Sequence, residues 1–368
     1  LDIRARDLCF TPDEVQAFLE LTVGAALPAD IANLLEERTE GWVVGLRLAA
    51  LSMRGLPDHT AFVQSFRGTH RDLMDYLVAE VLARQPQHIQ DFLLRTSILD
   101  RLCASLCDEV LGTRDWALEN DQLPTPDIRY PMSSRAILDG LERANLFLVP
   151  LDYERNWYRY HHLFQDSLRH RLHTELDADE LASMHRRASA WLAGNGFVEE
   201  ALDHALTAGD VEGAARLVED CRHDLLNREN RSALEQLSNR LPEDVVRARP
   251  ALLVARAWIL QLRYQIAEIP AILQEAEARL SAAAPAWSES EERSLRGEID
   301  ALWSVVWYLQ DEGQRALELA LGAMERIPAA RAFARSMAMI VAAMAYQMTG
   351  RARTAVRTLG DFLAESGA

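Results

Sequence analysis

The chain has 368 residues, of which 49% are hydrophobic and 26% charged, and its formal net charge is -17. This composition is typical of folded globular domains, and the length allows two or three of them. All 39 of the Lys+Arg residues are arginine, which excludes a Schiff-base lysine and the phosphate-binding lysine of a P-loop. The acidic balance argues against non-specific binding to DNA or to an anionic membrane.

Cysteine content and hydropathy indicate a cytoplasmic protein. Four cysteines in a chain of this length predict no disulfide framework and favour a reducing compartment. No apolar run reaches the roughly 18 residues that span a bilayer. Because the chain opens at Leu1 without a methionine or a signal-peptide pattern, we expect it to be part of a longer protein.

Residues 1–86 have the pattern of a small helical domain. Thr11 is placed as an N-cap, with Pro12 at the first helical position and Glu14 three residues after the cap. The segments PADIANLLEERTEGWVVGLRLAALSMRG and DLMDYLVAEVLARQP predict further helices, interrupted near Gly41 and ended at Pro86.

From residue 87 the predicted elements become shorter. QHIQDFLLRTSI, LCASLCDEVLG and SRAILDGLERAN predict three helices, and LFLVPLD and WYRYHH predict two strands around the turn YERN. Three helices followed by a hairpin is the order of a winged helix, which we place at residues 87–178. Between the second and third helices, TRDWALENDQLPTPDIRYPMS predicts a long surface loop.

Residues 179–368 are predicted to be helical throughout, in pairs. VVWYLQDEGQRALELAL and MAYQMTGRARTAVRTL align at an offset of 39, which places Trp307 over Tyr346 and Ala316 over Ala355. That offset exceeds by a short loop the roughly 34 residues of a tetratricopeptide repeat. We expect a mostly α chain that ends in a TPR-like helical solenoid of about three or four degenerate repeats, into which residues 242–282 fit poorly.

The glycine expected in the turn between paired helices is present in some pairs and absent from another. Gly350 precedes Ala355 by five residues, as Gly196 precedes Ala201, but the corresponding position before Ala316 is Asp311.

Motifs for hydrolysis and for metal binding are missing. The sequence has no P-loop, no G-x-S-x-G and no H-E-x-x-H, so we expect no enzymatic activity from this chain. Cys103 and Cys107 lie four residues apart on a predicted helix, where burial explains them better than a metal. The histidines at 161, 162, 170, 173 and 185 match no metal-ligand spacing, and no metal site is predicted.

The stretch WYRYHHLFQDSLRHRL, residues 157–172, concentrates aromatic and basic residues and has three interpretations. In the first, the aromatic and aliphatic side chains are core and the basic ones are solvated; the core set is Trp157, Tyr158, Tyr160, Leu163, Phe164 and Leu168. In the second, the winged helix binds DNA through Arg135, Arg143, Arg155 and Arg159, although Asp139, Glu142, Asp152 and Glu154 among them oppose phosphate.

The third interpretation follows from a resemblance. The segments RTEGWVVGLRLAALSMRG, FRGTHRDLMDYLVAEVLARQP, DFLLRTSILDRLCASLCDEVLG, LERANLFLVPLD and WYRYHHLFQDSLRHRL resemble, in this order, the MalT-type large ATP-binding regulators of the LuxR family, a branch of the STAND nucleotide switches. The resemblance implies a helical lid at 1–86, a winged helix and a helical-repeat sensor. It also implies that the P-loop core and the C-terminal helix-turn-helix lie outside this chain.

The resemblance further implies a nucleotide-facing set of residues. Gly45 to Leu48, GLRL, resembles the lid motif GLPL, with Arg47 in place of the proline that packs near adenine. YHHLF resembles the MHD motif, with His161 in place of the histidine that reaches the β-phosphate of ADP and His162 in place of the aspartate. His161 closes a strand and opens a helix, so its imidazole and nearby N–H groups are suited to a phosphate.

The function implied is the regulatory and sensing middle segment of an ATP-dependent transcriptional regulator. A small-molecule inducer or a protein would bind the solenoid, and the lid and winged helix would couple that event to ATP or ADP in the protein's own nucleotide-binding domain and to self-association. No cofactor is expected in this chain alone, nor any contact with DNA or a membrane. The alternative is a free-standing helical-repeat adaptor that binds protein and no nucleotide.

Overall fold

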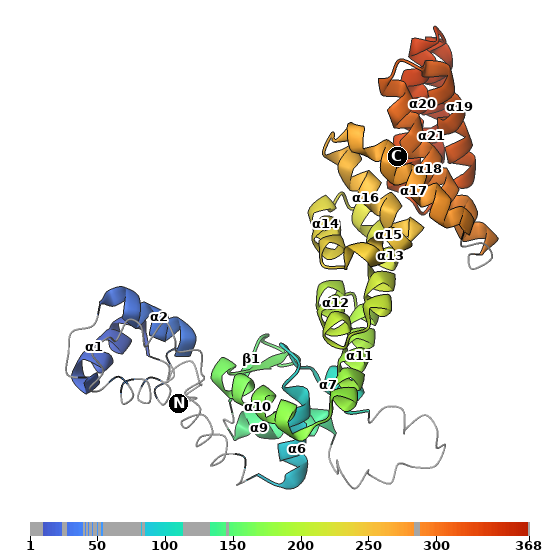
Figure 1. Ribbon diagram of the computed structural model, residues 1–368. Helices are drawn as coiled ribbons and strands as arrows, with labels where there is room; N and C mark the ends of the chain where they lie inside the picture. The colour runs from blue at the N-terminus through green and yellow to red at the C-terminus, as the bar shows by residue number, and fades with distance from the viewer. Residues whose placement is uncertain are drawn as a thin grey trace. The chain divides into compact units, whose positions relative to one another are not determined.

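A computed structural model gives the architecture of the chain (Figure 1). It describes residues 10–23, 28–39, 85–112, 133–144, 147–282 and 288–366, with single positions at 41, 43, 46, 50, 53 and 82. The chain divides into two compact units, residues 1–192 and 193–368. The sequence predicts three domains, with boundaries at 86/87 and 178/179, where the structure separates two units. These domain boundaries stay a prediction.

Two helices open the first unit, α1 (Pro12–Val23) and α2 (Ala29–Thr39). The predicted capping arrangement at the start of α1 is present, because the Thr11 backbone N–H donates to Glu14 at 2.9 Å and the Glu14 N–H donates to the Thr11 hydroxyl at 3.5 Å. The two helices pack through a small apolar cluster that includes Val15, Leu19 and Leu35. The helix predicted to end at Pro86 and the loop predicted after Gly112 lie outside the described residues.

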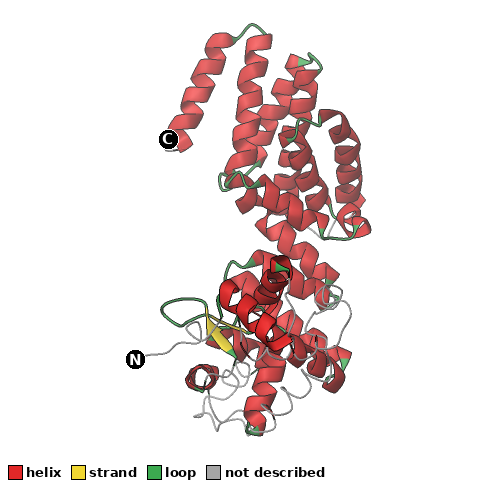
Figure 2. Ribbon diagram, turned by 90° about the vertical axis from the view of Figure 1, so that its left-hand side faces the viewer, coloured by secondary structure: helices red, strands yellow, loops and turns green. Residues whose placement is uncertain are grey.

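The winged helix has the predicted order of elements. Its helices are α6 (Gln87–Thr96), α7 (Ala104–Leu111) and α9 (Ser134–Arg143), followed by β1 (Leu148–Pro150), β2 (Tyr158–Tyr160) and α10 (His162–Glu175). The strands are antiparallel, with Leu148 opposite Tyr160 and Pro150 opposite Tyr158. This hairpin is the one sheet among the described residues (Figure 2).

Aromatic residues of the 157–172 stretch fill the core of the winged helix, as the first interpretation predicts. Its expectation that the basic residues are solvated is wrong for His161, which is buried. Tyr158, Tyr160 and Leu168 are fully buried, and Phe164 is nearly so. The Tyr160 hydroxyl lies 2.7 Å from the hydroxyl of Thr96 on α6, and burial raises the pKa of this phenol well above its usual value. Trp157 is partly buried, with its ring 6.2 Å from that of Trp191.

Helix α11 (Ala178–Gly194) is anchored to the winged helix by arginines. Arg187 donates to the backbone carbonyls of Glu109 and Val110, the latter at 2.6 Å, and so satisfies acceptors at the C-terminal end of α7. Arg95 on α6 pairs with Glu180 at 2.5 Å. These contacts fix the first part of α11 against α6 and α7.

The second unit is built from helices throughout its described part. In order they are α12 (Val198–Thr207), α13 (Val211–Asn227), α14 (Arg231–Asn239), α15 (Glu243–Ala248), α16 (Pro250–Leu262), the short 3₁₀ helix η2 (Ile266–Glu268), α17 (Ile269–Ala282), α18 (Glu289–Leu309), α19 (Gly313–Arg326), α20 (Ala332–Met348) and α21 (Ala352–Ser366). Consecutive helices pack side by side, which is the arrangement of a helical solenoid.

The predicted 39-residue repeat is visible in the helix boundaries. Helix α18 ends at Leu309 and α20 at Met348, and α19 begins at Gly313 and α21 at Ala352, so both pairs of boundaries differ by 39. Ala316 is fully buried and Ala355 nearly so, because small residues let the paired helices approach closely. Residues 242–282 differ from this pattern because they include two short helices, α15 of six residues and η2 of three.

One turn geometry recurs along the solenoid. The left-handed positions are Gly196, Gly209, Glu229, Tyr264, Asp311 and Gly350, and each lies two residues before a helix begins. After Asp311, the backbone N–H of Glu312 donates to the carbonyl of Trp307, five residues earlier. After Gly350, the N–H of Arg351 donates to the carbonyl of Tyr346 in the same way. Asp311, where the sequence lacks the expected glycine, therefore adopts the glycine conformation with φ of 63°.

Candidate functional site

The structure describes two of the three residues predicted to face a nucleotide. His161 is the N-cap of α10 and is buried, while His162, the first residue of the helix, is exposed. Arg47 lies outside the described residues. The predicted role of these residues toward ADP stays a prediction.

Strand β2 and helix α10 hold His161 from both sides. Its backbone N–H donates to the carbonyl of Phe147 at 2.8 Å, and its carbonyl accepts from the Gln165 N–H at 2.9 Å. The rings of Phe147 and Phe164 stack at 4.5 Å beside it. The Gln165 side chain donates to the carbonyls of Ser97 and Leu99, at 3.1 and 2.7 Å. The imidazole is therefore carried on a rigid support.

The imidazole of His161 joins the winged helix to the end of α2. Its Nε2 lies 3.1 Å from the carbonyl oxygen of Thr39, the last residue of α2. A carbonyl oxygen only accepts, so Nε2 must carry the proton in this contact. The C-terminal end of a helix has partial negative charge, which favours that donor. One histidine thus connects the helical part predicted as a lid to the strand and helix of the winged helix.

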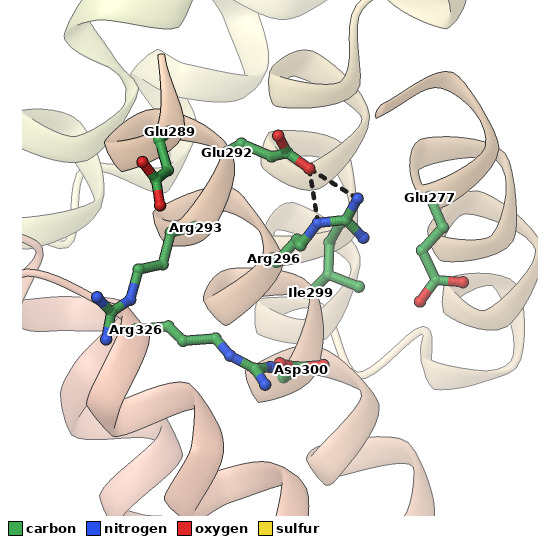
Figure 3. A pocket seen from close by; sticks show the side chains of 8 residues that line it. All are labelled: Glu277, Glu289, Glu292, Arg293, Arg296, Ile299, Asp300 and Arg326. Atoms are coloured by element: carbon green, nitrogen blue, oxygen red, sulfur yellow. Dashed lines mark hydrogen bonds and ion pairs between the residues drawn. The ribbon is translucent and has the colours of Figure 1, made fainter. Parts of the chain in front are cut away.

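A second candidate site is a groove in the solenoid between α17, α18 and α19. It consists of two adjoining pockets of about 490 and 590 Å³, which share Glu277, Asp300 and Arg326. Figure 3 shows one of them, with Arg326 of α19 extending to Asp300 of α18, and with the Glu292 and Arg296 pair of α18 on the side of Glu277 of α17. Arg326 pairs with Asp300 across the two helices, and Arg296 pairs with Glu292 within α18 at 2.8 Å.

Tryptophans line the other part of the groove. The rings of Trp303 and Trp307 stack at 6.1 Å, and the guanidinium of Arg315 lies 3.6 Å above the Trp307 ring. The indole N–H of Trp303 donates to Glu277 at 3.0 Å. The groove therefore offers aromatic faces bordered by charged hydrogen-bonding groups, a combination suited to a polar ligand or to a segment of a protein.

Sequence reasoning missed this groove. The signal was present in part, because Glu292, Arg296, Asp300, Trp303 and Trp307 recur at intervals of three or four residues and so share one face of a helix. What the sequence could not supply was the packing of α17 and α19 beside that face.

The described residues contain no group of three or more His, Cys, Asp or Glu placed to hold a metal ion. Cys103 and Cys107 are buried, and burial raises the pKa of the Cys107 thiol well above its usual value. None of the described helices is long and apolar enough to cross a membrane.

Comparison with known proteins places these features in a family. Residues 78–180 match the family profile of the MalT winged helix domain. The chain is 31% identical over 343 residues to the HTH-type transcriptional regulator MalT of Klebsiella pneumoniae subsp. pneumoniae, which covers 92% of this chain and 35% of that protein. It is 33% identical over 325 residues to the serine/threonine-protein kinase PknK of Mycobacterium tuberculosis H37Rv, which covers 88% of this chain and 27% of that protein.

A solved structure shares the fold. It is a signal transduction ATPase with numerous domains (STAND) protein with a tetratricopeptide repeat sensor, from Pyrococcus horikoshii. The similarity has a TM-score of 0.50 at 14% identity and covers 98% of this chain and 48% of that one.

Fold and site together define a protein in which a winged helix is followed by a helical-repeat solenoid. Residues 78–180 belong to the MalT winged helix family, and the similarity to MalT over 92% of the chain makes it a MalT-type regulatory segment. It spans about a quarter to a third of the length of the curated relatives it matches.

Proposed function

We propose that this chain is the regulatory and signal-sensing middle segment of an ATP-dependent transcriptional regulator of the LuxR family. The solenoid binds an inducer or a partner, and the lid and winged helix couple that event to ATP or ADP in the protein's own nucleotide-binding domain and to self-association. The chain itself performs no catalysis.

The two kinds of relative support a regulatory role. One is named a protein kinase and the other a transcriptional regulator, and the same segment is similar in both. A segment shared by proteins with different outputs is better explained as a control element than as the part that phosphorylates a substrate or binds DNA. Which output this protein has is part of the proposal.

The contact between His161 and Thr39 carries the proposal. It connects the predicted lid to the winged helix through a single buried side chain at 3.1 Å. A change in the position of α2 must therefore break or move this contact, and conversely a change in the winged helix must act on α2. A buried histidine whose hydrogen bond connects two such parts is suited to stabilising one of two arrangements.

Two of the four arginines considered for DNA binding are engaged by acids. Arg135 pairs with Asp139 at 3.1 Å and Arg155 with Glu142 at 3.0 Å. Neutralised arginines contribute little to phosphate binding, which supports a proposal without direct DNA contact from this part of the protein. The groove between α17 and α19 also suits a protein segment, so the free-standing adaptor is kept as the alternative function.

ADP release from the protein in its native length tests the proposal. We expect His161→Ala to speed the release of a fluorescent ADP analogue by fivefold or more, because the hydrogen bond from the winged helix to the Thr39 carbonyl is lost. His185→Ala is the matched control, since His185 is also a buried histidine but lies on α11, and it should release ADP at the wild-type rate.

Unchanged release in a folded His161→Ala protein would contradict the proposed coupling. Equal acceleration in both variants would assign the effect to general destabilisation and would also count against it.

A further inference from the structure

A buried carboxylate lies in the interior of the solenoid and joins helices that are distant in the sequence. Glu298 on α18 is fully buried. It pairs with Arg331 at 2.5 Å and accepts from the indole N–H of Trp258 at 3.3 Å. Arg222 and His223 on α13 lie at 3.9 and 3.6 Å from it. A buried charge with several partners is expensive to expose or leave unpaired.

Asn227, the last residue of α13, makes a second connection beside Glu298. Its side-chain amide donates to the carbonyl of Ala330 at 2.9 Å, and its side-chain oxygen accepts from the backbone N–H of Phe333 at 2.9 Å. Phe333 is in the first turn of α20, where backbone N–H groups have no partner within the helix. We call Glu298, Arg331, Arg222, His223 and Asn227 together the polar clasp.

The polar clasp spans an unusual distance along the chain. In a regular solenoid each repeat contacts only its neighbours, whereas Asn227 and Ala330 are 103 residues apart. The clasp therefore joins α13 directly to the α18–α20 part of the solenoid, while α14 to α17 occupy the sequence between them.

Gly297 connects the clasp to the groove. It lies between Arg296, which lines the groove, and Glu298, which belongs to the clasp. A Cβ at this position would approach the Cβ of Arg326 to 2.8 Å and the Cγ1 of Ile327 to 2.9 Å, so α18 lies in close contact with the C-terminal end of α19 here. Arg326 pairs with Asp300 in the groove, and the turn that follows it carries Arg331 of the clasp.

We propose that the polar clasp is the relay through which the groove acts on α13. Because packing at Gly297 leaves no free space, a shift between α18 and α19 cannot be absorbed locally. The turn at residues 327–331 must move, and with it the partners of Glu298 and Asn227. The inference rests on the proposed sensing role of the groove, and it assigns to that site a path of regulation inside the sensor.

Exchange of the Phe333 amide hydrogen tests the relay in the chain of 368 residues, without ligand or nucleotide. Phenylalanine labelled with ¹⁵N gives a tractable spectrum, since the chain has ten phenylalanines. Asn227→Ala removes the acceptor and should speed exchange at Phe333 by tenfold or more, which calibrates the probe. Arg326→Gln, which breaks the cross-helix pair in the groove, should speed it by fivefold or more.

Arg296→Gln is the matched control. Arg296 lines the same groove and carries the same substitution, but its ion pair with Glu292 lies within α18, so exchange at Phe333 should stay within twofold of wild type. Exchange of the Phe92 amide serves as an internal reference in the unit that carries no substitution. Exchange within twofold of wild type in Arg326→Gln, equal effects of Arg326→Gln and Arg296→Gln, or no effect of Asn227→Ala would each overturn the relay.

The outcome is separable from that of the ADP-release experiment. If the exchange experiment supports the relay but His161→Ala leaves ADP release unchanged, the coupling inside the solenoid stands and the proposed nucleotide coupling is wrong. If His161→Ala speeds ADP release but the exchange experiment fails, only the relay is wrong.

Discussion

At the scale of single residues, His223 shows how burial selects a protonation state. The side chain has an exposed fraction of 17% and lies between Arg222 and Arg331. Burial, followed by the repulsion of these two guanidinium groups, lowers the pKa of His223 from 6.5 to about 2. The carboxylate of Glu298 lies 3.6 Å from the His223 Nε2 and pairs with Arg331 at 2.5 Å. His223 is thus neutral in the folded chain.

This neutral histidine predicts a pH dependence of stability. As pH falls below 6.5, the unfolded chain binds a proton at His223 that the folded chain does not bind, so the free energy of unfolding decreases with falling pH. Between pH 7.5 and 5.5 we expect wild type to lose about 1.4 kcal/mol more than His223→Gln. Urea unfolding of both proteins at the two pH values measures the difference, and equal losses would show that His223 is not the group responsible.

At the scale of elements, the solenoid turns show how backbone geometry can persist when its usual residue changes. Three of the six left-handed turn positions are glycine, and Glu229, Tyr264 and Asp311 occupy the others. The left-handed conformation costs a residue with a Cβ about 1–2 kcal/mol. Packing of the helices on either side therefore imposes the turn, and a local sequence search for glycine finds only half of the positions.

Tyr264 gives a direct test of that cost. Its side chain is 89% exposed and its φ is 59°, so replacement removes little packing. We expect Tyr264→Gly to stabilise the chain against urea by about 0.5–1 kcal/mol, since the steric cost exceeds the extra freedom of glycine when unfolded. Tyr264→Ala retains the Cβ and should give no comparable gain. A gain of the same size in both variants would trace the effect to loss of the tyrosine ring.

Elements with local signals were predictable from the sequence, and contacts between distant elements were not. The cap at Thr11, the order of the winged helix and the 39-residue repeat depend on residues within a few turns of one another, or on internal similarity. The groove and the polar clasp depend on groups that meet only after packing, such as the Asn227 side chain and the Phe333 backbone N–H, 106 residues apart. Residues 242–282 lacked a repeat signal because short helices of unequal length fill this part.

The same distinction applies to the predicted site. A resemblance of YHHLF to a nucleotide-switch motif selected His161 without any knowledge of what surrounds it. Its contact with Thr39, 122 residues earlier in the chain, has no counterpart in the local sequence. The position could therefore be predicted, whereas the partner of the imidazole could not.

At the scale of the whole molecule, we propose that this segment controls the output of the protein and does not produce it. The relatives carry names of different outputs, a kinase and a transcriptional regulator, and the chain corresponds to 27% and 35% of their lengths. The solenoid groove, the polar clasp and the contact of His161 with α2 are all suited to transmitting a change of arrangement. A nucleotide bound by another part of the protein is the remaining element that the account requires.

The nucleotide content of the protein in its native length is a direct test of the proposed nucleotide-dependent regulation. After purification and denaturation, the released nucleotide would be quantified by ion-exchange chromatography, with the 368-residue chain treated in parallel. The account predicts close to one ADP or ATP per native protein and none with the chain alone. A native protein that carries no nucleotide and binds none when ATP or ADP is added would contradict the regulator and favour the helical-repeat adaptor.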